Sequence, residues 1–191
     1  MGKFTRAEWV QGTGALEISS LPLLAQALKD LEDLLILDKE PLTHTSTGSS
    51  VRKHGGSSKP ATQSPYNQTR YWMYVSDQKA AFSELYQFCF ILAKPPQGRN
   101  IDIETAIAFW SVLLGPRYPI ITDVIEFLNE KGTYKGANKD LWSMFCRTVD
   151  RSLKDYEADG AWPTLLDDFV AWRRGKMTST SNTDSHNVAE E

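Results

Sequence analysis

The sequence is poor in the residues that build metal and thiol sites. It has two cysteines and three histidines in 191 residues. Structural zinc sites of the finger or zinc-type ligase kind are rich in cysteine, so this class is excluded. Cys89 and Cys146 both fall in helical patterns beside aromatic residues. We therefore expect two buried free thiols in a reducing compartment, with no catalytic role.

Long apolar runs and a dominant charge of one sign are also missing. The formal net charge is −3, so no broad basic field exists for nucleic acid or an anionic membrane. Every long apolar stretch is interrupted by polar or charged residues, and none has the length of a bilayer span. The opening "MGKFTRAEWV" lacks the apolar centre of a signal peptide. The sequence thus predicts neither nucleic-acid nor membrane binding.

What the chain does have is helical periodicity. Apolar residues make up 41% of it and can fill a core. Leucines at spacings of three and four mark one clear amphipathic helix, and strand-like alternation is nearly absent. We predict an all-α fold, a compact multi-helix domain of short helices in an EF-hand-like arrangement without bound calcium. The expected helices cover residues 3–12, 19–40, 76–94, 102–115, 122–132, 138–150 and 163–174.

Composition divides the chain into four parts. Residues 1–42 form an N-terminal helical segment, and residues 71–173 form the main helical domain. Between them, residues 43–70 are rich in Ser, Thr, Gly and Pro and almost free of apolar side chains, which predicts a disordered insertion. Residues 174–191 are expected to be a disordered tail for the same reason. All three histidines, at positions 44, 54 and 186, lie in these two polar segments.

One acid-rich stretch, "DYEADGAWPTLLDDFV", resembles the start of a calcium loop. Acids occupy the first, third and fifth positions counted from Asp155, and Gly160 is the sixth. A calcium loop also needs a glutamate at its twelfth position, and that residue here is Leu166. Pro163 further disturbs the loop. We therefore predict no metal site.

The same stretch does not supply a catalytic carboxylate pair. Asp167 and Asp168 are adjacent on a helix and point about 100° apart, so they cannot face one substrate together. The histidines lie elsewhere, and Cys146 shares its helix with aromatic residues. No catalytic residue and no cofactor are predicted. From the residues alone, the two acids are either solvated side chains near a helix start or part of a docking surface.

Several stretches in order resemble the C-terminal domain of the defective-in-cullin-neddylation family, the PONY domain. They are "FSELYQFCFILAK", "IDIETAIAFWSVLLGPRYP", "KDLW" and "DYEADGAWPTLLDDFV". The resemblance runs from Phe82 to Trp172, and residues 3–42 are similar to the segment just before that domain. It implies an accessory ligase factor, a non-catalytic scaffold of the cytoplasm and nucleus that promotes cullin neddylation. Such a scaffold docks the winged-helix region at the C-terminus of a cullin and orients the neddylation conjugating enzyme.

The resemblance also implies two sites. The cullin-binding residues would be Asp140, Ala161 and Asp167: two carboxylates for basic partner groups, and a small side chain that permits close approach. An apolar pocket for the acetylated N-terminal Met of the conjugating enzyme would include Phe4, Leu92, Phe109 and Val112. Ordinary core packing is the alternative for each of these four.

The chain departs from the family pattern in two ways. It begins within the family's N-terminal half, so exposed apolar surface is expected around Phe4, Trp9 and Phe109. The alternative function is then a truncated, non-productive cullin-binding protein that cannot recruit the conjugating enzyme. The helix that contains Trp142 is also about three residues, nearly one turn, shorter than the pattern. This makes the placement of Asp140 relative to Ala161 and Asp167 an open question.

Overall fold

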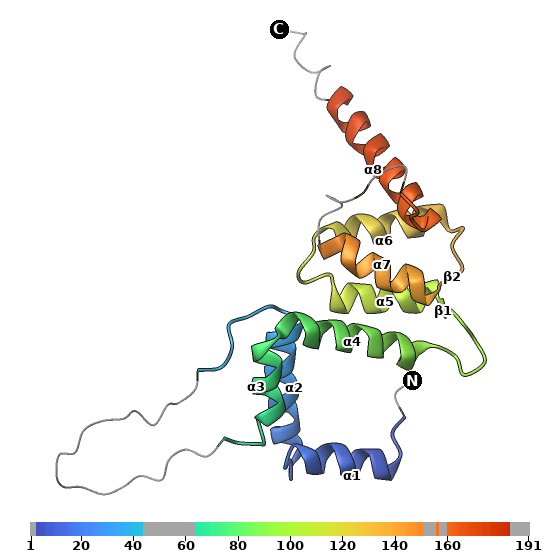
Figure 1. Ribbon diagram of the computed structural model, residues 1–191. Helices are drawn as coiled ribbons and strands as arrows, with labels where there is room; N and C mark the ends of the chain where they lie inside the picture. Colours follow the sequence, from blue (N-terminus) through green and yellow to red (C-terminus); the bar gives the residue numbers. More distant parts are fainter. Residues whose placement is uncertain (1–2, 44–63, 151–155, 157–159, 184–191) are drawn as a thin grey trace, which may run out of the picture. The chain divides into compact units, whose positions relative to one another are not determined.

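The computed structural model describes residues 3–43, 64–150, 156 and 160–183 (Figure 1). Within these residues the fold is helical, with one short antiparallel strand pair. The chain divides into two compact units, Met1–Glu84 (unit 1) and Leu85–Glu191 (unit 2). The all-α prediction is confirmed. Among the helices of the described part, none combines the length and the apolar character that crossing a membrane requires.

Unit 1 contains α1 (Arg6–Ala15), α2 (Leu21–Leu35), α3 (Thr69–Ser76) and the start of α4 (Gln78–Ala93). Thr5 and Glu8 form a capping box, which explains why α1 begins later than the predicted residue 3. Pro22 lies in the first turn of α2, where its missing N–H leaves no helix bond unmade. Helix α2 buries Ala27, Leu34 and Leu35, whereas Leu21 and Leu28 of the predicted leucine stripe are exposed, so the stripe is only partly buried.

The predicted start of α4 is wrong by one residue. Ser76 is the last residue of α3, and its hydroxyl donates to the Met73 carbonyl at 2.7 Å. Asp77 caps α4 instead, because its Oδ1 accepts the Ala80 N–H at 3.0 Å. Ser and Asp are both good cap residues, so their order in the sequence could not separate them.

The predicted disordered insertion, residues 43–70, falls mainly on residues 44–63, which lie outside the described residues. Its last residues have a described structure. Tyr66 is buried, and its hydroxyl donates to Asp30 Oδ2 at 2.8 Å. Asn67 bonds α1 through its backbone N–H, which donates to the Leu16 carbonyl at 2.9 Å. These residues therefore belong to the packing of unit 1.

Unit 2 contains the rest of α4, α5 (Ile103–Leu113), α6 (Ile120–Lys131), α7 (Lys139–Asp150) and α8 (Thr164–Thr183). Strands β1 (Ile101–Asp102) and β2 (Gly136–Ala137) pair antiparallel, Ile101 with Ala137 and Asp102 with Gly136. Each strand lies in the connection between two helices, so the pair joins two helix–loop–helix motifs. This is the expected EF-hand-like arrangement, and the strands are an addition that the sequence did not predict.

Local signals set most helix ends in unit 2. Asp102 caps α5 by accepting the Thr105 N–H at 2.8 Å, and Asn138 caps α7 by accepting the Leu141 N–H at 2.7 Å. The Thr105 hydrogen bonds also lower the pKa of the Asp102 carboxyl. Gly132 ends α6 with a φ of 59°, a conformation that favours glycine. The predicted start at Thr122 is wrong: α6 begins at Ile120, after Pro119.

The core of unit 2 is aromatic. Trp110 and Trp142 are fully buried, and their ring centroids lie 5.8 Å apart. Tyr86 stacks on Trp142 at 4.4 Å, and its hydroxyl accepts from Trp110 Nε1 at 2.9 Å and donates to the Trp142 carbonyl at 3.0 Å. Trp142 Nε1 donates to the Tyr86 carbonyl at 3.1 Å. This cluster fixes α4, α5 and α7 to one another.

Helix α8 is longer than predicted. Residues 184–191 of the expected disordered tail lie outside the described residues, but the helix continues to Thr183. Arg173 Nε donates to Asp123 Oδ2 at 3.0 Å, and Lys176 pairs with Glu126 and lies over the Trp172 ring, 4.9 Å from its centroid. Ion pairs with α6, and a cation–π contact within α8 itself, thus support the extension of a helix whose sequence is polar.

Candidate functional site

The residues expected to contact cullin lie at the N-terminal ends of two helices in unit 2. Asp140 is exposed in the first turn of α7, and Asp167 is half-buried in the first turn of α8. Ala161 is exposed in the short segment that leads into α8. Carboxylates in a first turn are stabilised by the helix dipole, and both acids remain available to a basic partner.

Two tyrosines hold the acids of α8. The Tyr156 hydroxyl donates to Asp167 Oδ1 at 2.6 Å, and the Tyr134 hydroxyl donates to Asp168 Oδ2. The hydrogen bond to Asp167 raises the pKa of Tyr156, while burial and then the bond to Asp168 raise the pKa of Tyr134. Both phenols therefore stay protonated and donating at neutral pH.

Tyr156 also connects Asp167 to the segment that contains Ala161. Its ring packs on Trp162, with centroids 5.6 Å apart, and Trp162 directly follows Ala161. Tyr156 thus contacts Asp167 through its hydroxyl and Trp162 through its ring. Sequence reasoning missed Tyr156 and Tyr134, since neither lies at helical spacing from the acid that it contacts.

Asp140 differs from Asp167 in the surroundings of its carboxylate. In the described part of the chain, no hydrogen bond or ion pair engages its carboxylate, which is exposed beside Lys139. Asp167 is thus the preorganised acid of the expected patch, and Asp140 is a solvated one.

The residues expected to form the apolar pocket are divided between the two units. In unit 2, Leu92 is 46% exposed on α4 and Val112 is 61% exposed on α5, while Phe109 is half-buried with its ring edge-on to Trp142. In unit 1, Phe4 is 75% exposed and contacts Trp9 edge-to-face. The predicted exposure is confirmed at Phe4 and Trp9, whereas Phe109 partly belongs to the core. Leu92 and Val112 are too exposed to be core residues.

Further exposed apolar residues accompany Leu92 on α4. Phe88 and Ile91 are exposed as well, and Phe88 precedes Leu92 by one helical turn. The sequence pattern concealed this face, because apolar residues occupy nearly every side of α4. An unpartnered apolar surface of this kind suits a protein contact.

The sequence also raised two other candidate sites, the cysteines and the calcium-like stretch. Cys89 is buried, as predicted, and burial raises the pKa of its thiol. Cys146 is half-buried, so the prediction of a fully buried thiol is wrong there. Asp155 and residues 157–159 of the loop lie outside the described residues. Across the ranges that the structure describes, no group of three or more His, Cys, Asp or Glu side chains could hold a metal ion.

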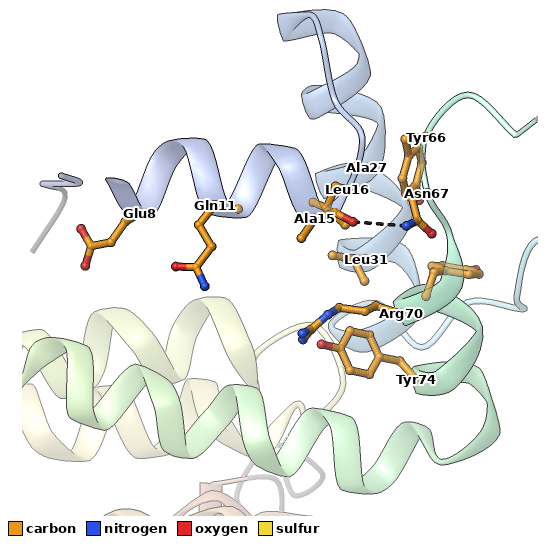
Figure 2. Close-up of a pocket in the computed structure, with 12 residues that line it drawn as sticks. Glu8, Gln11, Ala15, Leu16, Ala27, Leu31, Tyr66, Asn67, Arg70 and Tyr74 are labelled. Carbon is orange, nitrogen blue, oxygen red and sulfur yellow. Dashed lines mark hydrogen bonds between the residues drawn. The ribbon is translucent and has the colours of Figure 1, made fainter. Parts of the chain in front are cut away.

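Unit 1 has a pocket of about 470 Å³ between α1, α2 and α3 (Figure 2). Its polar atoms are largely engaged within the fold. Glu8 belongs to the capping box, Asn67 Nδ2 donates to the Ala15 carbonyl at 3.3 Å, and the Tyr71 hydroxyl accepts the Leu42 N–H at 2.9 Å. None of the residues expected at either binding site lines this pocket.

Comparison with known proteins decides the family. A family model described as cullin binding matches residues 64–172, more than half of the chain. The chain belongs to the cullin-binding family. Asp140, Ala161 and Asp167 all lie inside the matched region, as do Leu92, Phe109 and Val112, whereas Phe4 lies before it.

Relatives in the cullin-binding family include DCN1-like proteins of several animals. DCN1-like protein 5 of Homo sapiens is 38% identical over 103 residues, which cover 52% of this chain and 43% of the relative. DCN1-like protein 4 of Danio rerio is 31% identical over 182 residues, 94% of this chain and 50% of the relative. The chain therefore spans half or less of the length of these relatives.

Proposed function

We propose that this chain is an accessory factor of cullin neddylation in the cytoplasm and nucleus. It docks the winged-helix region at the C-terminus of a cullin through Asp140, Ala161 and Asp167. It acts by positioning: it holds the cullin and the neddylation conjugating enzyme together, and it forms no covalent intermediate itself. Holding two reactants in the right geometry turns an encounter in solution into an effectively unimolecular step.

The observation that carries the proposal is the anchored acid beside a small residue in the matched region. Asp167 accepts a hydrogen bond from Tyr156, whose ring packs on Trp162, next to the exposed Ala161. A fixed carboxylate loses little side-chain entropy when it binds a lysine or arginine, and alanine lets the partner approach closely. The surrounding surface supplies the rest of the contact area, because three side chains alone do not give a stable interface.

Titration of an isolated cullin winged-helix domain tests the docking surface. Asp167→Ala should weaken binding at least about tenfold, or about 1.4 kcal/mol, because it leaves a basic group of the partner unpaired. Ala161→Arg should weaken it further, since it adds bulk and a like charge. Calorimetry gives the affinities, and circular dichroism checks the fold of each variant.

Asp168→Ala is the matched control for this titration. It removes an acid of the same helix, and Asp168 is bonded to Tyr134 rather than to Tyr156. Its affinity should stay close to that of the wild type. If Asp167→Ala and Ala161→Arg also bind as tightly as the wild type, the assignment of the patch is wrong.

A reconstituted transfer assay tests the recruitment of the conjugating enzyme. Wild-type chain should speed transfer of the modifier to cullin. Val112→Asp should remove the acceleration while cullin binding persists, because a charge replaces an exposed apolar side chain of unit 2 that is expected to contact the conjugating enzyme. Met177→Asp, at an exposed apolar residue of α8, is the control. Normal cullin binding by the wild type without any acceleration would instead identify a non-productive cullin-binding protein.

A further inference from the structure

A second pocket, of about 600 Å³, lies in unit 2 beside the start of α7. It is formed by the C-terminal half of α4, the connection that follows α4, and the first turns of α7. We call it the basic pocket, because three of its lining residues are cations and none is an acid. The residues that matter below are Gln87, Ile91, Lys94, Arg99, Lys139 and Ser143.

Among the described residues, no carboxylate pairs with the cations of the basic pocket. Lys94 Nζ donates to the Pro95 carbonyl at 3.2 Å and to the Gly98 carbonyl at 2.9 Å, which orients its charge without neutralising it. Arg99 and Lys139 are exposed, and no ion pair with another described residue involves either one. Three unneutralised cations at one pocket contrast with the net charge of −3 for the chain. Such a site attracts an anionic group.

The remaining groups of the pocket also favour an anion. Gln87 Nε2 donates to Ser143 Oγ at 3.2 Å, and the second hydrogen of the Gln87 amide is one further donor at the wall. Lys139 is the first residue of α7, where the helix dipole is positive. The neighbouring acid, Asp140, points about 100° away around the helix and does not line the pocket.

Apolar contact decides which anion fits. Ile91 lines the pocket and is 67% exposed, so a ligand with an aliphatic portion would bury it. Phe90, the aromatic residue of the lining, is buried and offers no free face for a nucleic-acid base. A pocket of this size also exceeds the needs of a single small ion.

We infer that the basic pocket binds an acidic peptide segment of a protein partner. Its glutamate or aspartate carboxylates pair with Lys94, Arg99 and Lys139, and an aliphatic side chain between them packs on Ile91. This surface is distinct from the proposed contacts at Ala161, Asp167 and Val112. Because Lys139 adjoins Asp140, an acidic segment bound here would lie next to the proposed cullin patch.

The test uses the full chain and a fluorescent capped peptide of alternating glutamate and leucine. Fluorescence anisotropy should show binding that weakens as salt rises, and a glutamine–leucine peptide of equal length should bind at least about tenfold more weakly. The double variant Arg99→Ser and Lys139→Ser should lose about tenfold in affinity for the glutamate peptide. Both residues are exposed, so the variant should keep the circular dichroism of the wild type.

The matched control is Lys131→Ser with Arg174→Ser, which removes two exposed cations of unit 2 away from the pocket and should leave the affinity unchanged. A phosphoserine–leucine peptide that binds more tightly than the glutamate peptide would support the anionic-peptide site and identify phosphate as its preferred group. Three results would overturn the inference. The glutamine peptide binds as tightly as the glutamate peptide, no peptide binds, or a single-stranded oligonucleotide binds more tightly than the peptides. No cullin is present, so the result is independent of the cullin titration.

Discussion

Trp142→Ala is expected to lower the free energy of unfolding by about 3–5 kcal/mol. The side chain is fully buried and stacks between Tyr86 and Trp110, with centroid distances of 4.4 and 5.8 Å. Its removal leaves a cavity among three helices, and it leaves the Tyr86 carbonyl without the indole N–H. Since domains are commonly stable by about 5–15 kcal/mol, this single change removes a large part of the total.

Chemical denaturation followed by circular dichroism measures the loss. Trp142→Phe is the matched variant: it keeps most of the apolar volume and should cost about 1–3 kcal/mol, from the smaller ring and the lost indole hydrogen bond to the Tyr86 carbonyl. Trp9→Ala is the surface control, because Trp9 is half-exposed on α1 and should change stability far less. Equal midpoints for Trp142→Ala and Trp9→Ala would contradict a core built on Trp142.

Tyr86 explains why this core tolerates polar atoms. Its hydroxyl accepts from Trp110 Nε1 and donates to the Trp142 carbonyl, so every polar group of the cluster has a partner. Burial raises the pKa of the Tyr86 phenol well above its ordinary value, which keeps the donating proton in place. In the described part of the chain, no buried side-chain nitrogen or oxygen lacks a hydrogen-bond partner.

Helix ends were predictable where a single residue decides them. Asp102, Asn138 and Gly132 act at their own positions, through one side-chain oxygen or one positive φ. The prediction was wrong where neighbours compete, as at Ser76 and Asp77, or where a proline starts the helix early, as at Ile120. Local rules cannot rank two adjacent residues that are both suited to the same role.

The strand pair shows a different limit. Each strand has two residues, too few for an alternating pattern, and their partners lie far apart in the sequence. Gly136 is a residue that the strand pair requires, because a Cβ at this position would lie 2.6 Å from the Ile101 carbonyl oxygen. A glycine that permits such close approach is visible in the sequence, but its partner strand is not.

The sequence predicts which acids belong to the expected site, but not the tyrosines that hydrogen-bond to the acids of α8. The motif around Asp167 predicts the acid, while its hydrogen-bond partner, Tyr156, precedes it by eleven positions. Tyr134 reaches Asp168 from the connection between α6 and α7, thirty-four positions away. Periodicity reports which face of a helix is apolar, and it carries no information about such contacts between segments.

Phe127→Ala is the other substitution with a large expected effect, again about 3–5 kcal/mol in the free energy of unfolding. Phe127 is fully buried on α6, and its ring meets Phe169 at 5.6 Å and Trp172 at 5.7 Å, both on α8. It also lies 5.9 Å from Tyr134, the partner of Asp168. The loss should therefore weaken the packing of α8 against α6. Figure 1 shows α8 beginning beside α6.

Hydrogen exchange distinguishes this local effect from general destabilisation. Without denaturant, the amides of α8 should exchange faster in Phe127→Ala than in the wild type. The exchange rates of the α5 amides should change less, because α5 is fixed by the separate Trp110–Trp142 cluster. Phe127→Leu, which retains most of the volume, should cost about 1–1.5 kcal/mol and give a smaller change. Since Asp167 is carried by α8, the same variant should also weaken cullin binding under the proposed function. Uniform acceleration of exchange in α5 and α8 would show instead that unit 2 opens as one cooperative body and that Phe127 does not specifically hold the helix of the proposed site.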